Sequence, residues 1–223
     1  METKSFNNTK RRSSKYTLLL PTLNRPDYLK RYLSYYSKQK TGAKIIIADA
    51  STGDYKKQNK AIIEQFPDLN ILHLAKYPAS LLHNRRVLHA LNYVKTKYCI
   101  ITADDDFTVP NAINKAVDFL EKNPDYTIAH GKYYKFFLER NKGTQFYWKP
   151  LYKCESIESS DAKSRLISHL SSYSLPTFYG VSKTIFLKMI FKENKKYIDK
   201  DDAHFGELLM SGLTLIYGKM KCL

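Results

Sequence analysis

Short apolar runs alternate with amphipathic stretches along the first half of the chain. The apolar runs have the length of buried strands and cover residues 16–20, 43–48, 70–74 and 98–102. Apolar residues recur at helical spacing in the segments between and after them, at 28–36, 57–66, 81–94 and 111–122. This alternation predicts an α/β fold, a Rossmann-related, mainly parallel sheet with helices on both faces.

The pattern is weaker after residue 126. We expect strands at 127–130 and 132–139 around a bulge at Gly131, followed by an aromatic loop at 143–152. Helices are predicted at 161–171 and 203–211, with a short strand at 179–181 between them. Residues 1–15 are polar and basic and predict a flexible tail, so residues 16–223 are expected to form a single domain.

The chain is strongly basic, with 37 lysines and arginines against 21 aspartates and glutamates and a formal charge of +16. Such a charge attracts nucleic acid, an anionic membrane or a phosphorylated substrate. The basic residues are spread along the chain, and no zinc finger or RNP-type motif organises them. The 18 tyrosines fall mostly at core-facing positions. A nucleic-acid-binding module is therefore an alternative, but nucleic acid is not the expected partner.

The three cysteines, Cys99, Cys154 and Cys222, are odd in number and widely spaced, without a CxxC pair. This spacing indicates neither a disulfide framework nor a zinc–thiolate site, and Cys99 is expected in the core. The sequence has no secretion signal and no apolar run long enough to cross a bilayer. We therefore expect a cytoplasmic protein.

Three predicted strands end in polar loops, at residues 22–25, 49–51 and 104–106. Ligands of open α/β sheets bind at the carboxyl ends of strands, so these loops are candidates for one site. The adjacent carboxylates of Asp104, Asp105 and Asp106 repel each other unless a cation offsets their charge. Mg²⁺ or Mn²⁺, bound together with substrate phosphates, fits such a cluster. The alternative is that one of these acids caps the following helix.

Further candidates for this site lie in the loops after the strands and in a predicted helix. The carboxylate of Asp49 can accept hydrogen bonds from a base N–H or a ribose hydroxyl, or it can cap the next helix. Arg25 and Arg85 carry forked donors that can neutralise diphosphate oxygens, or they are surface arginines.

Taken in order, the segments 17–25, 45–51, 80–86 and 101–106 resemble family 2 glycosyltransferases. The resemblance implies a GT-A fold, a nucleotide-sugar donor that is usually a UDP-sugar, and inversion at the anomeric carbon. It places a DxD-type metal motif on Asp104 and Asp106 and the nucleotide pocket at Thr22 and Asp49. Asp104 or Asp105 can then serve the ribose while Asp106 contacts the metal.

The resemblance also implies a catalytic base on or before a helix downstream of the metal motif. Glu207 is the first candidate because residues 205–209 resemble the segment that holds this acid, although the family usually has an aspartate there. Asp201 and Asp202 are the alternatives, and either can instead cap that helix. On this interpretation residues 16–122 bind the nucleotide sugar. Residues 123–223 bind the acceptor, and whether this half is truncated is left open.

A glycan or lipid-linked molecule is the expected acceptor, and the basic surface would allow peripheral contact with an anionic membrane. A nucleotidyltransferase that uses the same acidic cluster is a further alternative. Such an enzyme would normally carry a glycine-rich, lysine-bearing loop after the first strand, and residues 21–27 contain no glycine.

Overall fold

The computed structural model describes residues 14–139, 145–151, 153–173, 177–197 and 203–223. The strands are β1 (Tyr16–Thr22), β2 (Lys44–Asp49), β3 (Asn70–Leu74), β4 (Tyr98–Ile101), β5 (Tyr126–His130), β6 (Tyr134–Glu139), β7 (Gln145–Pro150), β8 (Val181–Lys183) and β9 (Lys219–Cys222). The helices are α1 (Pro26–Gln39), α2 (Gly53–Glu64), α3 (His83–Leu91), α4 (Pro110–Lys122), α5 (Ala162–Ser171), α6 (Thr184–Tyr197) and α7 (Ala203–Tyr217), with a 3₁₀ turn η1 (Thr177–Tyr179).

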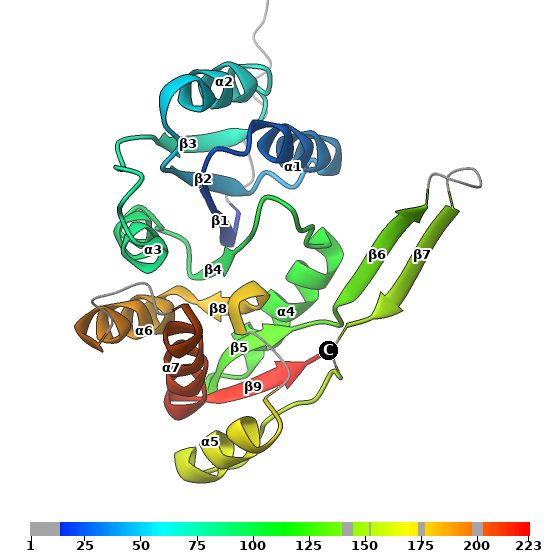
Figure 1. The fold of residues 1–223 in the computed structure, drawn as a ribbon. Helices are drawn as coiled ribbons and strands as arrows, with labels where there is room; N and C mark the ends of the chain where they lie inside the picture. Colours follow the sequence, from blue (N-terminus) through cyan, green and yellow to red (C-terminus); the bar gives the residue numbers. More distant parts are fainter. Residues whose placement is uncertain (1–13, 140–144, 152, 174–176, 198–202) are drawn as a thin grey trace, which may run out of the picture.

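Seven of the strands form one sheet in the order β3-β2-β1-β4-β8-β5-β9 (Figure 1). β1 pairs in parallel with both β2 and β4, and β2 pairs in parallel with β3. β8 is antiparallel to both of its neighbours, β4 and β5, whereas β5 and β9 are parallel. The predicted α/β fold with a mainly parallel sheet is therefore confirmed.

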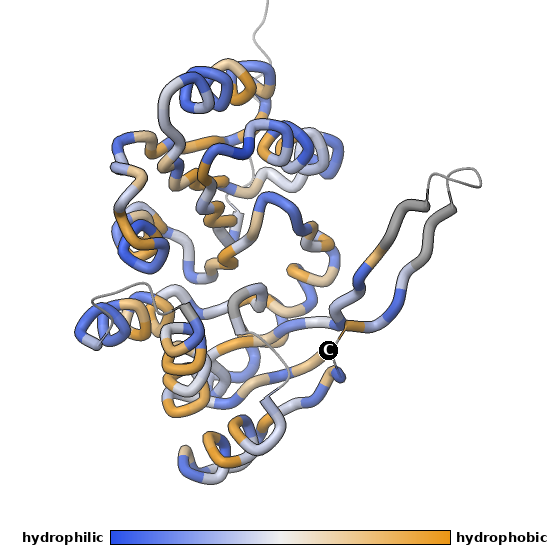
Figure 2. The backbone as a smooth tube through the Cα atoms, viewed as in Figure 1, coloured by the Kyte–Doolittle hydropathy of each residue, from blue (hydrophilic) through white to orange (hydrophobic). Residues whose placement is uncertain are grey.

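Helices cover both faces of the sheet, because each buried strand directs alternate side chains to opposite sides. Leu18 and Leu20 of β1 pack in a core with residues of α1 and α4, whereas Leu19 packs in a second core with residues of α3, α6 and α7. Figure 2 shows the hydrophobic positions concentrated in the strands of the sheet and on α7. Burying one leucine side chain contributes about 1.5–3 kcal/mol, so this double coverage fixes the strand ends on which the site lies.

The second half of the chain differs from expectation in several elements. Residues 145–150, expected within an aromatic loop, form β7, which pairs with β6 in a hairpin that projects from the main sheet (Figure 1). The sequence pattern also missed helix α6 and strand β9. Helix α7 continues to Tyr217 rather than ending near residue 211.

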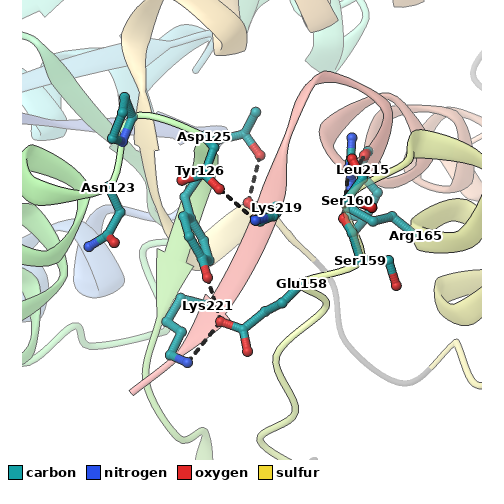
Figure 3. Close-up of polar contacts among 12 residues, drawn as sticks. Asn123, Asp125, Tyr126, Glu158, Ser159, Ser160, Arg165, Leu215, Lys219 and Lys221 are labelled. Atoms are coloured by element: carbon teal, nitrogen blue, oxygen red, sulfur yellow. Dashed lines mark hydrogen bonds and ion pairs between the residues drawn. The ribbon is translucent and has the colours of Figure 1, made fainter.

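A polar network fastens the segment before α5 onto the edge of the sheet (Figure 3). Oε1 of Glu158 accepts hydrogen bonds from Lys221 Nζ at 2.9 Å and from the Tyr126 hydroxyl at 2.5 Å. The buried guanidinium of Arg165 donates to the carbonyls of Ser159, Ser160, Leu215 and Ile216. These contacts hold β9, α5 and the end of α7 together, so the edge strand is covered rather than open.

Within the part of the chain that the structure describes, no helix combines the length and apolar character needed to cross a bilayer.

Candidate active site

Asn24 ties the loop after β1 to the loop after β2. Its φ of 54° is left-handed, a conformation that asparagine tolerates better than most residues. The Asn24 backbone N–H donates to Ser51 Oγ at 2.7 Å, and its side-chain oxygen accepts from the Thr52 backbone N–H at 2.9 Å. Arg25 then forms the N-cap position of α1, with Pro26 as the first helical residue. The loop therefore leaves β1 in a fixed direction, toward the end of β4.

The carboxylate of Asp104 is buried directly after β4. The Thr22 hydroxyl donates to its Oδ2 at 2.7 Å, and Arg25 Nη1 lies 2.8 Å from its Oδ1, in an ion pair that lacks the alignment of a hydrogen bond. Burial raises the pKa of Asp104, and the contacts with Thr22 and Arg25 offset only part of that rise. Asp104 is thus a desolvated acid with both oxygens already engaged.

The guanidinium of Arg25 spans two acids. Its Nη2 donates to Asp105 Oδ2 at 2.8 Å while Nη1 faces Asp104, and its other side covers the ring of Tyr28, 4.0 Å from the ring centroid. Exposed ion pairs contribute at most about 1 kcal/mol, so the Arg25–Asp105 contact orients the guanidinium more than it stabilises the fold. The predicted juxtaposition of Arg25 with the acidic loop is present.

Asp106 is exposed at its tip, yet enough protein surrounds it for desolvation, followed by the charge of Asp105, to raise its pKa. The Tyr179 hydroxyl lies near its carboxylate, and burial together with the charge of Asp106 raises the pKa of Tyr179. Tyr179 therefore stays protonated beside Asp106. Of the three acids, Asp106 is the one whose carboxylate Arg25 does not pair.

A cavity of about 500 Å³ opens at these strand ends. Thr22, Arg25 and Asp104 line one side, and Tyr179 and Glu207 line another. Glu207 lies on α7, where its Oε1 accepts a 2.8 Å hydrogen bond from the Tyr173 hydroxyl. The structure therefore brings the first candidate base into the same cavity as the acidic loop.

Asp49 does not line this cavity with the others. It is fully buried, and its carboxylate accepts from the Ser51 backbone N–H at 2.8 Å, from Asn59 Nδ2 at 3.0 Å and from His73 Nε2 at 2.9 Å. Burial raises its pKa, but the hydrogen bonds from His73, Ser51 and Asn59 outweigh burial and lower the pKa overall. The Thr52 side chain, at the N-cap position of α2, makes no capping hydrogen bond, and Asp49 instead organises the loop before that helix.

The two adjacent arginines of α3 face different cavities. Arg86 is buried and donates from Nη1 to the Thr22 carbonyl at 3.1 Å, at the wall of the 500 Å³ cavity. Arg85, the residue chosen from the sequence, lines a second cavity of about 930 Å³ that also includes His73 and Tyr77. Sequence reasoning therefore missed Arg86, which ends the segment 80–86 that carries the family resemblance, and Tyr179, which lies in no motif that was singled out. Asp201 and Asp202, the alternative bases, lie outside the described residues.

The acidic loop offers carboxylate oxygens that could hold a hard divalent cation. Burial raises the pKa values of Asp104 and Asp106, so a nearby cation would favour their ionised forms. Carboxylate oxygens are the donors that Mg²⁺ and Mn²⁺ prefer, and a cation beside Asp106 would supply positive charge. Because Thr22 and Arg25 already hold both oxygens of Asp104, Asp106 is the residue better disposed to bind such an ion.

Comparisons with known proteins identify the family and the fold of the chain. The model of glycosyl transferase family 2 matches residues 17–189. A crystal structure of S. aureus TarS is similar, with a TM-score of 0.65 and 19% identity over 93% of this chain and 35% of TarS. The structure of TarS 1–349 in complex with UDP-GlcNAc also has a TM-score of 0.65 and 19% identity, over 93% of this chain and 55% of that chain.

A more distant structure, 4-diphosphocytidyl-2C-methyl-D-erythritol synthase from Anaerococcus prevotii, has a TM-score of 0.53 and 11% identity, over 93% of this chain and 87% of that chain. At these identities the likeness shows the fold alone. No curated protein sequence matches the chain significantly. The chain spans between about a third and a little over half of the TarS chains that it resembles.

Proposed function

This chain belongs to glycosyl transferase family 2, and from this premise we propose that it transfers a sugar from a UDP-sugar to a glycan or lipid-linked acceptor, with inversion at the anomeric carbon. The observation that carries the proposal is the convergence of Thr22, Arg25, Asp104 and Arg86 on one cavity at the carboxyl ends of β1 and β4. A cavity of about 500 Å³ is in the range of small-molecule sites. TarS, with the same fold, has been crystallised with UDP-GlcNAc and with UDP.

In this proposal the positive side chains hold the donor diphosphate. Arg25 is already oriented by Asp105 and Tyr28, so its guanidinium needs little reorganisation to face phosphate oxygens. Arg86 lies behind Thr22 and adds a buried positive charge to the same wall. Asp104 and Asp105 are the candidates for the ribose hydroxyls, with Asp104 fixed by Thr22.

The proposed metal is Mn²⁺ or Mg²⁺, held by Asp106 with or without Asp104. When bound, such an ion neutralises the negative charge that develops on the leaving diphosphate. The protonated Tyr179 hydroxyl lies close enough to Asp106 to donate to its carboxylate and is proposed to orient this ligand for the ion. Glu207 faces the cavity from α7 and is proposed to take the proton of the acceptor hydroxyl, with Asp201 and Asp202 as alternatives.

Donor binding can be tested by thermal unfolding with a panel of nucleoside diphosphates, with and without Mn²⁺. We expect UDP to raise the midpoint temperature of unfolding more than the other nucleotides do. The rise should be larger in the presence of Mn²⁺ than in its absence. Asp106→Ala should keep the fold and remove the part of the UDP-induced stabilisation that depends on Mn²⁺. Asp68→Ala, which changes an exposed acid remote from the site, is the matched control. A response that is independent of metal, or unchanged in Asp106→Ala, would overturn the proposed mechanism.

The charge of +16 supports a further part of the proposal, peripheral contact with an anionic membrane where lipid-linked acceptors lie. Each basic residue near such a surface contributes on the order of 1 kcal/mol. Co-sedimentation with anionic vesicles should therefore fall as salt concentration rises. Sedimentation that is equal at low and high salt removes this part of the proposal and leaves the donor chemistry untouched.

A further inference from the structure

Three side chains with metal-binding atoms gather where β5 and β9 end, away from the acidic loop. They are His130, Cys154 and Cys222, whose ligand atoms all lie within 4.8 Å of one another. His130 is the last residue of β5, and Cys222 is the last residue of β9. The group lies outside the set of residues that line the 500 Å³ cavity, so the proposed transfer chemistry does not use it.

Backbone pairing brings the three residues together. The parallel register of β5 and β9 places His130 opposite Cys222. The segment that holds Cys154 runs antiparallel to β9 through the Ile157–Met220 bridge. Ser156 Oγ accepts the Cys222 backbone N–H at 3.1 Å. Glu158, fixed by Lys221 and Tyr126, anchors the same segment a few residues further on (Figure 3). The cluster is therefore built on the sheet rather than on a free loop.

The imidazole of His130 is in the state that binds a metal. Its Nδ1 lies 2.9 Å from the Gly131 carbonyl oxygen. A carbonyl can only accept, so Nδ1 carries the proton and Nε2 carries a lone pair. His130 is 3% exposed, and its Nε2 has no hydrogen-bond partner among the described residues. Histidines that bind metals commonly donate their other N–H to a backbone carbonyl in this way.

The two cysteines supply the charge and the softness that such a site needs. In the structure Cys154 and Cys222 are joined as a disulfide, with Cα atoms 5.5 Å apart, and both are half-buried. Once the bond is reduced, two thiolates can offset the charge of a divalent ion without help from a carboxylate. Thiolate and imidazole together favour Zn²⁺ over the hard ions that suit the Asp106 loop.

We propose that, with the disulfide reduced, Cys154, Cys222 and His130 bind one Zn²⁺ ion through two sulfurs and the imidazole Nε2, with a fourth position for water. An external dithiol or phosphine supplies the two electrons that reduce the disulfide, and the two thiols take up two protons from solvent. Binding of Zn²⁺ then releases these two protons and leaves the imidazole neutral, so charge and atoms balance. The sulfurs move apart to about 3.8 Å, the separation that a tetrahedral ion with Zn–S bonds of about 2.3 Å requires. The disulfide and the zinc complex are therefore mutually exclusive states of the same pair.

Aromatic rings connect this cluster to the acidic loop. The His130 and Tyr133 rings lie 5.8 Å apart, and the Tyr133 and Tyr179 rings lie 6.4 Å apart, centroid to centroid. Tyr179 in turn lies beside Asp106, whose charge raises the pKa of the Tyr179 hydroxyl. The two sites are thus separate in ligand chemistry but share one wall of packed rings, so an ion at the cluster would also steady the wall that carries Tyr179.

The test uses the full chain reduced with a phosphine in the absence of oxygen, with Co²⁺ as a spectroscopic probe. We expect one Co²⁺ per chain to give an intense thiolate-to-cobalt charge-transfer absorption that Zn²⁺ abolishes. Cys154→Ser and Cys222→Ser should lose this absorption, and His130→Ala should weaken or lose it. Cys99→Ala, which removes the remaining thiol, and Asp106→Asn, which alters the carboxylate site, should both retain it.

A second measurement needs no variant. Zn²⁺ should protect Cys154 and Cys222 of the reduced wild-type chain from alkylation, as read by mass spectrometry of the peptides. The proposal is overturned if Co²⁺ binds without the charge-transfer absorption, if Zn²⁺ leaves both cysteines equally reactive, or if the pair remains oxidised after phosphine treatment. Failure of UDP binding would leave this result unaffected, because the two tests use different ligands.

Discussion

The hydroxyl of Thr22 donates a 2.7 Å hydrogen bond to Oδ2 of Asp104, a residue 82 positions away in the chain. The parallel pairing of β1 with β4 brings the end of β1 beside the loop that follows β4, so the contact depends on the sheet as well as on that loop. The Thr22 carbonyl also accepts from Arg86. One residue thus links a buried carboxylate to a buried guanidinium at the wall of the cavity.

Replacing Thr22 with valine keeps the shape of the side chain and removes the donor. A buried carboxylate that loses a hydrogen bond costs about 1–3 kcal/mol, so we expect Thr22→Val to lower the free energy of unfolding by that amount in urea titrations. It should also raise the pKa of Asp104 further, because this hydrogen bond favours the ionised form. Thr52→Val is the control, since the Thr52 side chain makes no capping hydrogen bond. Equal losses in the two variants would contradict this reading.

In the metal-free protein, ionised Asp106 should lower the free energy of unfolding at neutral pH. Its pKa is raised in the folded state by desolvation and by Asp105, so its favourable contribution is present at acid pH and is lost as pH rises through the folded pKa. Asp106→Asn should therefore raise the melting temperature at pH 7, with a gain that shrinks toward pH 4, near the ordinary aspartate pKa.

Adding Mn²⁺ gives a second test of the role of Asp106. Mn²⁺ should raise the melting temperature of the wild type and leave that of Asp106→Asn unchanged. Asp68→Asn, which removes the same charge at an exposed position, should keep the Mn²⁺ response of the wild type. A lower melting temperature for metal-free Asp106→Asn at pH 7 would show that this carboxylate is already compensated.

Asp49 should behave in the opposite way. Its pKa is lowered in the folded state, so its contribution to stability is present above the unfolded pKa and is lost as pH falls through the folded value. Asp49→Asn places an amide N–H₂ among the donors of Ser51, Asn59 and His73. We expect Asp49→Asn to lower the free energy of unfolding by at least about 2 kcal/mol at pH 7, and by less at acid pH.

The exposed, ion-paired Asp54 gives the matched control for Asp49, because Asp54→Asn removes the same charge at the surface. Urea unfolding at several pH values measures both variants. If Asp49→Asn unfolds like Asp54→Asn at pH 7, the buried network does not stabilise the fold as its geometry indicates.

The centre of the parallel half could be predicted because β1, β2 and β4 are buried almost throughout, on both faces. Such strands are continuous apolar runs, and the expected strand at 43–48 lies within one residue of β2. The edge strand β3 is only partly buried, yet the expected strand at 70–74 coincides with it. Strand β9 has four residues, of which only Met220 is buried, so its sequence carries almost no pattern. Strand β7 pairs only with β6 in a projecting hairpin, where alternation between core and solvent is not imposed. Its prediction as a loop was wrong for that reason.

Helix α6 did have a usable signal. Its buried residues Leu187, Ile190, Phe191 and Asn194 follow helical spacing, although basic residues occupy its last turn. At the site, the choice between Arg85 and Arg86 depends on the rotation of α3, because successive helical residues point about 100° apart. The sequence did not indicate the Cys154–Cys222 pair. Cys222 lies on β9, and because that strand was not predicted, its pairing with Cys154 could not be predicted either.

The identity of the catalytic base gives the last prediction. Glu207 lines the cavity from α7, and the Tyr173 hydroxyl orients its Oε1. Glu207→Gln keeps the shape and this hydrogen bond but cannot accept a proton. If Glu207 is the base, the rate of sugar transfer at saturating donor should fall by roughly 100-fold or more, with donor affinity unchanged.

Two matched variants decide the result for Glu207. Glu193→Gln removes a carboxylate from an ion pair with Lys196 on α6 and should leave transfer unchanged. Asp202→Asn tests the alternative acid before α7. A large loss in Asp202→Asn together with retained turnover in Glu207→Gln would move the role of base to Asp202, because an amide in place of the true base cannot sustain proton removal from the acceptor hydroxyl. Donor affinity measured on the same samples separates either outcome from a defect in the nucleotide pocket.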